Sequence, residues 1–232
     1  MKTDSSLPIS FIMIATLRKF SLDRHITSYA KLQYTVAALI RGNQFFVAKK
    51  SVKNSKLLNV GCGPNPHPDY INLDFHWNRD IDICWDITKK SYPIHSSSLE
   101  GIYTEHCLEH ISFDSFNANM AEFYRMLKPG SVVRIIMPDG ELYLDIYQKR
   151  KNGENIRMPH EVGYITPMAR INGIFRNHGH QFIYDFETMK KLLQQAGFTN
   201  IKKCSYRTGA DQRLLVDQDW RAVESLYVEA TR

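Results

Sequence analysis

Two glycines one residue apart follow a short apolar run, and their spacing suits ligand binding. The run at residues 57–60 leads into Gly61 and Gly63, where the lack of a Cβ lets the backbone approach a ligand closely. A second run, residues 70–73, ends at Asp74, and a carboxylate there can accept hydrogen bonds from both hydroxyls of a ribose. The pattern favours a nucleoside-type cofactor on a doubly wound α/β sheet, although a glycine pair after a strand is often only a turn.

The elements that must position these residues follow from alternating apolar runs and helical patterns. We expect strands at residues 56–60, 70–73, 81–85, 99–104, 132–137, 200–206 and 224–230, and helices at residues 113–127 and 185–196. Asp185 is the predicted N-cap of the second helix, and Gly197 is its predicted C-cap. Alternating strands and helices favour a largely parallel sheet, with ligands at the carboxyl ends of its strands.

Three motifs in a fixed order carry a family resemblance: Asn59-Val60-Gly61-Cys62-Gly63, Glu109-His110-Ile111 and Met126-Leu127-Lys128-Pro129-Gly130. In this order the chain resembles the class I S-adenosylmethionine-dependent methyltransferases, in particular the type 11 domain, over about residues 56–198. The resemblance implies a Rossmann-like, mostly parallel seven-stranded sheet with an antiparallel last strand, in a three-layer sandwich. It also implies S-adenosylmethionine as the cofactor.

The same resemblance implies roles for individual residues. Gly61 and Gly63 would pass under the methionine part of the cofactor, and Asp74 would bind the ribose. Asp86 and the backbone of Ile87 would face the adenine, with a strand-end cap or turn as the alternative for both aspartates. The full set of predicted cofactor residues is Asn59, Gly61, Cys62, Gly63, Asp74, Asp86, Ile87 and Glu105.

Two departures from the family pattern affect this site. Asn59 stands where the family has an acidic residue, and Asn65 stands at the third glycine, so the ammonium of the cofactor would lack one attractive charge. Only ten residues separate Gly63 from Asp74, and three of them are proline. A crossover helix needs more chain than this and does not tolerate internal proline. We therefore expect the first crossover helix to be missing, as in a compact branch associated with polysaccharide and surface-glycan loci.

Two histidine-containing segments offer acid–base chemistry. Residues 105–110 place Glu105 after the fourth strand and supply two carboxylates and two imidazoles, which could contact the acceptor or bind a divalent ion. The alternative is that Glu109-His110 is a structural pair. The other segment holds His178 and His180, with no obvious third metal ligand nearby. We predict His178, His180 and Glu105 as catalytic residues, and our predicted site includes no metal.

The basic charge of the chain is concentrated at its N-terminus. Residues 1–56 hold ten Lys and Arg against two acids, which leaves twenty against twenty-two in the remainder of a chain with net charge +6. We predict a basic helical extension at residues 1–55, which packs on the domain or a partner subunit or lies on an anionic membrane, with a disordered segment as the remaining alternative. A methyltransferase domain at residues 56–232 would follow, with an acceptor-side insertion at residues 139–180. The four cysteines form no CxxC pair, which favours a reduced, cytoplasmic protein.

These features predict a methyltransferase that acts on an oxygen atom of a small molecule or glycan. One alternative is a methyltransferase-like subunit without catalysis that binds or scaffolds. Another is an RNA methyltransferase steered by the basic extension, although the charge balance of the remaining chain argues against nucleic acid as a partner.

Overall fold

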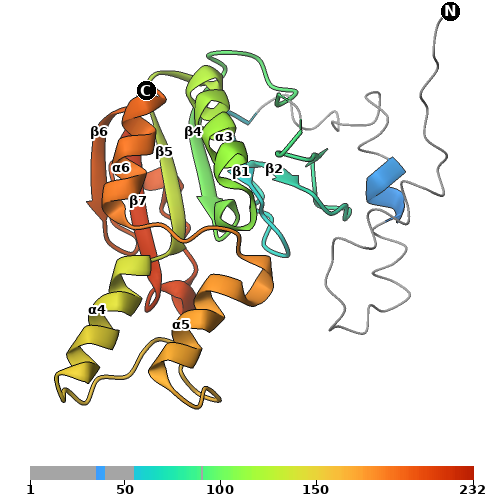
Figure 1. Ribbon diagram of the computed structural model, residues 1–232. Helices are drawn as coiled ribbons and strands as arrows, with labels where there is room; N and C mark the ends of the chain where they lie inside the picture. The colour runs from blue at the N-terminus through green and yellow to red at the C-terminus, as the bar shows by residue number, and fades with distance from the viewer. Residues whose placement is uncertain (1–34, 40–54, 90) are drawn as a thin grey trace, which may run out of the picture.

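The computed structural model describes residues 35–39, 55–89 and 91–232 (Figure 1). Residues 35–39 are helical, and the rest of the predicted extension up to residue 54 lies outside the described residues. Within the described part of the chain, no helix is long and apolar enough to cross a bilayer. The predicted contacts of the extension with a membrane or a subunit therefore stay predictions.

A seven-stranded sheet forms the centre of the molecule, in the order β3-β2-β1-β4-β5-β7-β6. Only β7 runs antiparallel to its neighbours, which confirms the predicted mostly parallel sheet with an antiparallel last strand. The strands are β1 (Leu57–Val60), β2 (Ile71–Asp74), β3 (Ile83–Cys84), β4 (Leu99–Glu105), β5 (Leu127–Pro138), β6 (Thr199–Cys204) and β7 (Ser225–Thr231). Strand β3 is shorter than predicted because it lies at the edge and pairs with β2 at only two positions.

A turn without a helix connects β1 to β2, as the proline-rich step predicted. The side chain of Asn72 holds this turn: its Oδ1 accepts from the N–H of His67 at 2.8 Å, and its Nδ2 donates to the carbonyl of His67 at 2.8 Å. The N–H of Gly61 donates to the carbonyl of Leu73 at 2.8 Å. These bonds bring the carboxyl ends of β1 and β2 together without a crossover helix.

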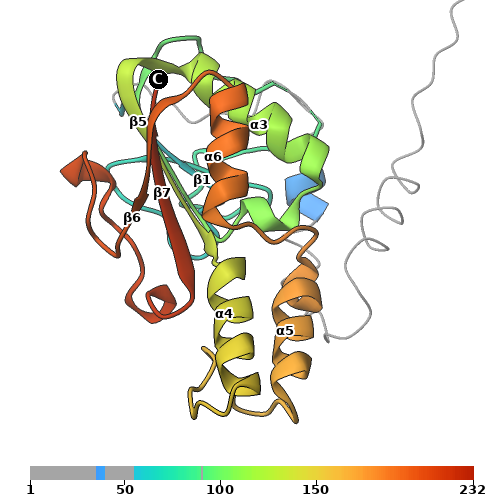
Figure 2. The same cartoon turned by 60° about the vertical axis from the view of Figure 1, so that its left-hand side comes forward.

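Helices α3 (Phe113–Met126) and α6 (Phe186–Gln195) cover one face of the sheet (Figures 1 and 2). Ser112 and Asp185 cap their N-termini by accepting from backbone N–H groups, so the predicted Asp185 cap is confirmed. The apolar side of each helix packs into the main core, with Phe116 and Phe123 fully buried in α3 and Leu193 in α6. Burial of these side chains fixes α3 against β5 and α6 against β6 and β7.

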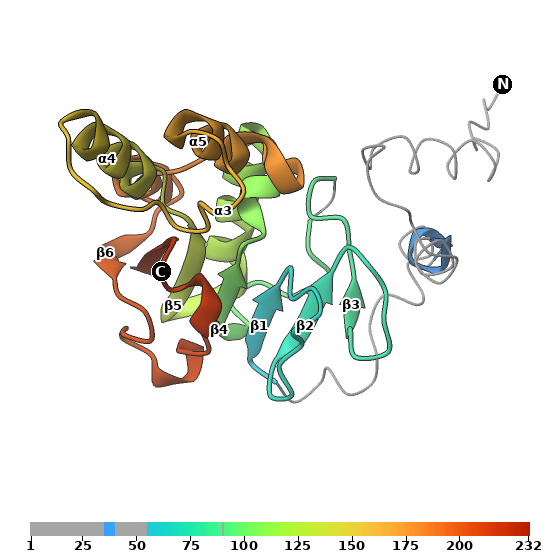
Figure 3. The ribbon, with the colours of Figure 1, turned by 90° about the horizontal axis from the view of Figure 1, so that it is seen from below.

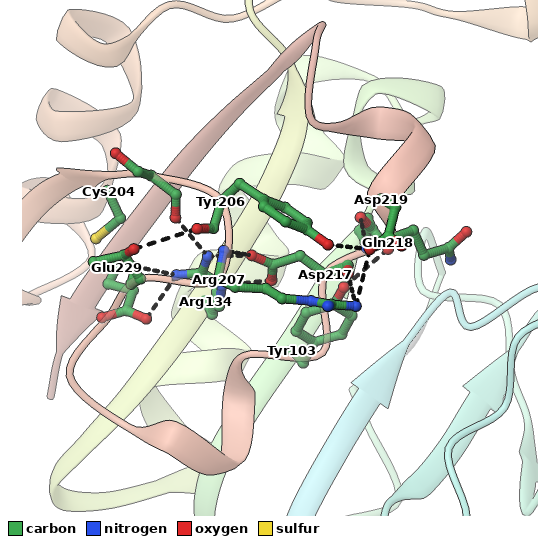
Figure 4. A network of polar contacts seen from close by, with 12 residues as sticks. Tyr103, Arg134, Cys204, Tyr206, Arg207, Asp217, Gln218, Asp219 and Glu229 are labelled. Carbon is green, nitrogen blue, oxygen red and sulfur yellow. Dashed lines mark hydrogen bonds and ion pairs between the residues drawn. The ribbon is translucent and has the colours of Figure 1, made fainter.

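The opposite face of the sheet is covered, within the described residues, by the segment 205–224, which contains the 3₁₀ helices η5 (Gln212–Leu214) and η6 (Asp219–Arg221). Arg134 of β5 is completely buried beneath it and joins Asp217 to Glu229 of β7 (Figure 4). Its Nε and Nη2 donate to Asp217 at 2.8 and 2.5 Å, and its Nη1 donates to Glu229 at 2.9 Å. Burial alone would lower the pKa of Arg134, but the carboxylates of Asp217 and Glu229 have the larger effect and raise this pKa. This network attaches the segment to the sheet.

Beyond the carboxyl ends of β4 and β5, the predicted insertion forms a helical hairpin of α4 (Gly140–Lys151) and α5 (Pro167–Arg176) (Figures 2 and 3). The hairpin has a small core of its own, which includes Tyr143, Ile146 and Ile174. Tyr143 and Ile146 lie on α4 and Ile174 lies on α5, so this core joins the two helices. The hairpin therefore borders the edge of the sheet where a ligand is expected.

Candidate functional site

The glycine loop after β1 adopts backbone angles that favour glycine. Gly61 has φ +69° and Gly63 has φ +53°, a region that costs energy for residues with a Cβ. At position 61 a Cβ would overlap the Sγ of Cys107, whereas at position 63 it would meet nothing within 4 Å. The loop therefore presses against the segment after β4 at Gly61 and borders open space at Gly63.

Asp74 lies at the end of β2 with its carboxylate directed at this loop. Its Oδ2 accepts from the N–H of Gly63 at 2.8 Å, and its Oδ1 accepts from the N–H of His76 at 2.7 Å. An ionised carboxylate has about four acceptor positions, so each oxygen can accept one more hydrogen bond. Asp74 and the glycine pair thus form one unit at the carboxyl ends of β1 and β2.

The remaining residues of the predicted cofactor set lie around this unit in different settings. Asn59 is buried in β1, and its Nδ2 contacts the Oδ1 of Asn72 at 3.5 Å. Burial, with Asp74 nearby, raises the pKa of Cys62 well above its usual value, so Cys62 is a neutral packing residue. The Oδ1 of Asp86 accepts from the backbone and hydroxyl of Thr88 at 3.0 and 2.6 Å. Asp86 therefore stabilises a turn, and its predicted contact with the adenine stays a prediction.

The carbonyl of Ile87 accepts from the side chain of Asn119 at 2.9 Å. This bond ties the segment after β3 to α3. It orients the backbone of Ile87 next to the carboxyl end of β3, where the adenine was predicted.

Glu105 is the last residue of β4 and shares a face of the sheet with Tyr103. Its Oε2 accepts from the hydroxyl of Tyr103 at 2.9 Å, and its Oε1 accepts from the N–H of Gln218 at 3.1 Å. The chain after it forms only a single 3₁₀ turn, η3 (Leu108–His110), and His106 has φ +47°. The prediction that Glu105 follows the fourth strand is therefore wrong, because the strand continues through Glu105.

Glu109 is instead the centre of a buried cluster of imidazoles. Its Oε1 lies 3.4 Å from Nδ1 of His106, 3.8 Å from Nε2 of His110 and 4.0 Å from Nε2 of His180. Neither carboxylate oxygen has a hydrogen-bond partner among the described residues. Burial raises the pKa of Glu109, but the neighbouring His106 and His110 outweigh it and hold that pKa below its usual value.

The two histidine segments of the sequence meet at this cluster. The N–H groups of Gln181 and Phe182 both donate to the carbonyl of Glu109, at 2.8 and 3.4 Å. The Nδ1 of His180 lies 2.6 Å from the carbonyl of Ile174, which directs its Nε2 toward Glu109. Burial lowers the pKa of both His110 and His180. The exposed His178 lies beside them, with a ring-centroid distance of 6.0 Å to His180.

Sequence reasoning missed the partnership between Glu109 and His180. The motif Glu109-His110 and the His-x-His pair were both visible, but about seventy residues separate them along the chain. A possible signal was that both segments follow strands that are neighbours in the predicted sheet, so that their carboxyl ends meet.

A second polar cluster joins the hairpin to the start of β7. Glu224 accepts from the hydroxyl of Tyr143 at 3.0 Å, and its carboxylate lies 3.6 Å from Arg170, 3.7 Å from His160 and 3.8 Å from Arg221. The next residue of the chain, Ser225, contacts His106 at 2.8 Å. The two clusters are thus adjacent at the same edge of the sheet.

Comparison with known proteins identifies the family. A family model described as a methyltransferase domain matches residues 30–203, so the chain belongs to this methyltransferase family; the match begins within the predicted extension. No curated protein matches the sequence. With this strand order and family, the protein is an S-adenosylmethionine-dependent methyltransferase.

Solved structures with this fold come from several organisms. A Thermotoga maritima methyltransferase, described as a possible histamine N-methyltransferase, has a TM-score of 0.50 and 13% identity over 97% of this chain and 99% of that chain. An Archaeoglobus fulgidus methyltransferase has a TM-score of 0.46 and 15% identity, and the match covers 86% of this chain and 94% of that chain. Phosphoethanolamine N-methyltransferase 2 of Haemonchus contortus has a TM-score of 0.45 and 12% sequence identity, and the match covers 98% of this chain and 60% of that chain. At these identities the likeness concerns the fold.

The glycine loop and Asp74 fit S-adenosylmethionine. Open space borders Gly63, and the adjacent Asp74 carboxylate keeps acceptor positions that suit ribose hydroxyls. When bound, the cofactor supplies a methyl group on a sulfonium. The protein then needs mainly to align the acceptor and accept its proton.

Proposed function

We propose that this methyltransferase transfers a methyl group to a hydroxyl oxygen of a small molecule or glycan. The main support is the group of histidines around Glu109, at the sheet edge that also carries the glycine loop. A hydroxyl must lose its proton as it is methylated, and imidazole is the usual group to accept it near neutral pH. Cys107 connects the two parts, since it packs against Gly61 and lies two residues before Glu109.

In this proposal His178 accepts the proton, and His180 positions the imidazole of His178. His178 is exposed and has φ +60° and ψ +8°, a backbone conformation that is strained for residues other than glycine and is often found at functional sites. Glu105 is a weaker candidate for the base, because Tyr103 and Gln218 already donate to its two oxygens. In the cofactor site we keep Gly61, Gly63 and Asp74 as the principal contacts.

We further propose that residues 139–180 cover the acceptor. The polar groups around Glu224, which include Tyr143, His160 and Arg170, can donate to and accept from several hydroxyls at once. Such a set suits a sugar better than an apolar acceptor. Residues 56–232 would then form the catalytic domain.

The test is a methylation assay with S-adenosylmethionine that carries a deuterated methyl group. Hydroxylated acceptors such as sugars, sugar nucleotides and phenols are compared with amines and with RNA, and the labelled product is located by mass spectrometry and NMR. We expect a labelled methyl ether. Label found only on nitrogen, or only on RNA, would reject the proposal.

A further inference from the structure

The least satisfied buried group in the described part of the chain is the carboxylate of Glu109. Its side chain is 1% exposed, and both of its oxygens lack a hydrogen-bond partner among the described residues. A buried carboxylate without hydrogen bonds is costly unless a cation compensates it. The hydroxyl of Tyr184 and the Nε of Arg221, which both interact electrostatically with Glu109, are also buried without a hydrogen-bond partner. Several buried polar atoms around Glu109 therefore lack a hydrogen-bond partner among the described residues.

Three ligand atoms converge on the same point. The Nε2 atoms of His110 and His180 lie 3.8 and 4.0 Å from Oε1 of Glu109. Taken together, the ligand atoms of these three residues are all within 4.8 Å of one another. Ligands about 2.1 Å from a tetrahedral ion are about 3.4 Å apart, so modest rotations of the side chains would close the set around an ion.

We propose that Glu109, His110 and His180 bind a divalent transition-metal ion of the Zn²⁺ type. Two imidazoles and one carboxylate form a ligand set used for zinc, with a fourth position left for water. The ion would add a permanent positive charge beside the buried carboxylate, whose nearest basic neighbours are imidazoles.

His106 and Arg221 are the competing sources of charge. The Nδ1 of His106 lies 3.4 Å from Oε1 of Glu109, and its Nε2 contacts the hydroxyl of Ser225 at 2.8 Å. The guanidinium of Arg221 already pairs with Glu224 at 3.8 Å.

The surroundings of the ligands have the features of a supported metal site. The Nδ1 of His180 lies 2.6 Å from the carbonyl of Ile174, and a bond of this kind fixes the tautomer that leaves Nε2 free to bind a metal. Gln181 donates to the carbonyls of both Glu109 and His110, at 2.8 and 2.7 Å. These bonds hold the ligands together although they come from two distant segments. His110 is 35% exposed and gives the ion a path from solvent.

The ion would serve the proposed function without depending on it. On that function, the fourth position also suits an acceptor hydroxyl, whose proton the ion would make easier to remove. The binding test uses no acceptor. Its failure therefore leaves the O-methylation proposal untouched, and a failed methylation assay leaves the metal site untouched.

The test measures metal binding by the full chain after treatment with chelator and dialysis. Zn²⁺ binding is measured by calorimetry, and Co²⁺ is added as a spectroscopic probe of tetrahedral coordination. We expect one ion per chain for the unmodified protein. The isosteric variant Glu109→Gln and the variant His110→Gln should each weaken binding by at least about tenfold, the lower end of losses seen for supporting residues at metal sites.

His178→Asn is the matched control, because it removes the neighbouring imidazole and leaves the three ligands. We expect it to bind Zn²⁺ as the unmodified protein does, and circular dichroism checks that every variant is folded. If His110→Gln folds and binds normally, or if only His178→Asn loses the metal, the ion belongs to surface histidines and the proposal is wrong. Absence of Zn²⁺ and Co²⁺ binding by the unmodified protein would also overturn it.

Discussion

The side chain of Cys107 packs directly onto Gly61, so that the turn after β4 rests on the glycine loop after β1. A Cβ at position 61 would overlap the sulfur of Cys107 and lie 2.6 Å from its Cβ. Burial, with the carboxylates of Asp74 and Glu109, raises the pKa of the same cysteine far above its usual value. This contact couples the cofactor loop to the histidine cluster.

We predict that Gly61→Ala loses cofactor affinity and destabilises the fold by more than about 1 kcal/mol, because the residue has φ +69° and the new methyl group meets Cys107. Cys107→Gly in the same chain should restore part of the stability by removing the clash. Gly63→Ala is the control for stability alone, since Gly63 also has positive φ but its Cβ would meet nothing within 4 Å. Urea unfolding and calorimetry with S-adenosylmethionine measure both effects. Equal losses at positions 61 and 63 would contradict the packing role of Cys107.

Asp74→Asn should reduce cofactor binding while leaving the protein folded. The amide keeps the size of the side chain but loses the charge and one acceptor, both of which suit ribose hydroxyls. Because Asp74 also accepts from Gly63 at 2.8 Å, the glycine loop should loosen as well. Calorimetry with S-adenosylmethionine and its demethylated product is the measurement, with the exposed Asp80→Asn as control. Unchanged affinity in Asp74→Asn would remove this carboxylate from the site.

Strands β1 to β4 were predictable because they are apolar runs that lead to a glycine or an acidic residue. The missing crossover helix was predictable too, since Pro64, Pro66 and Pro68 leave no room for one. The boundaries of β3 were not, because an edge strand is defined by pairing with one neighbour and not by its own composition. The cover made by residues 205–224 was also missed, since it depends on the buried contact of Arg134 with Asp217.

The candidate site was predictable only where neighbouring residues form it. Gly61, Gly63 and Asp74 follow consecutive strands, and their meeting follows from a parallel sheet. The contact of Glu109 with His180 depends on how the chain returns after the α4–α5 hairpin, which the local pattern does not encode. The position of Glu105 illustrates the same limit, because its partner Gln218 lies 113 residues away.

Arg134→Met should destabilise the protein by about 3–5 kcal/mol, because it leaves Asp217 buried without its counter-charge. The control is Lys128→Met, which breaks a partly exposed pair with Glu100 at 2.8 Å and should cost less than about 1 kcal/mol. Chemical denaturation measures both free energies of unfolding. Similar losses in the two variants would show that the buried network is dispensable.

Asp185→Ala should cost about 1 kcal/mol at neutral pH by removing the cap of α6. Hydrogen bonds from Thr188 hold the pKa of Asp185 below its usual value of 3.8. Because the folded pKa is the lower one, this stabilisation is present above about pH 4 and is lost as the pH falls through the folded pKa. The difference in the free energy of unfolding between the unmodified protein and Asp185→Ala, measured with urea, should therefore become smaller in acid. Ser112→Ala removes an uncharged cap, so its loss of free energy of unfolding should not depend on pH in this way.

His178→Asn should lower turnover by about 10²–10⁴-fold with little change in cofactor affinity, the range expected for loss of a general base. Asparagine tolerates the left-handed backbone at φ +60°, so the variant removes the imidazole without adding strain. Steady-state kinetics on the acceptor found in the methylation assay gives kcat and KM, and calorimetry gives cofactor affinity. The exposed His95→Asn is the control. If His178→Asn and His180→Asn both turn over normally, the proton is accepted elsewhere.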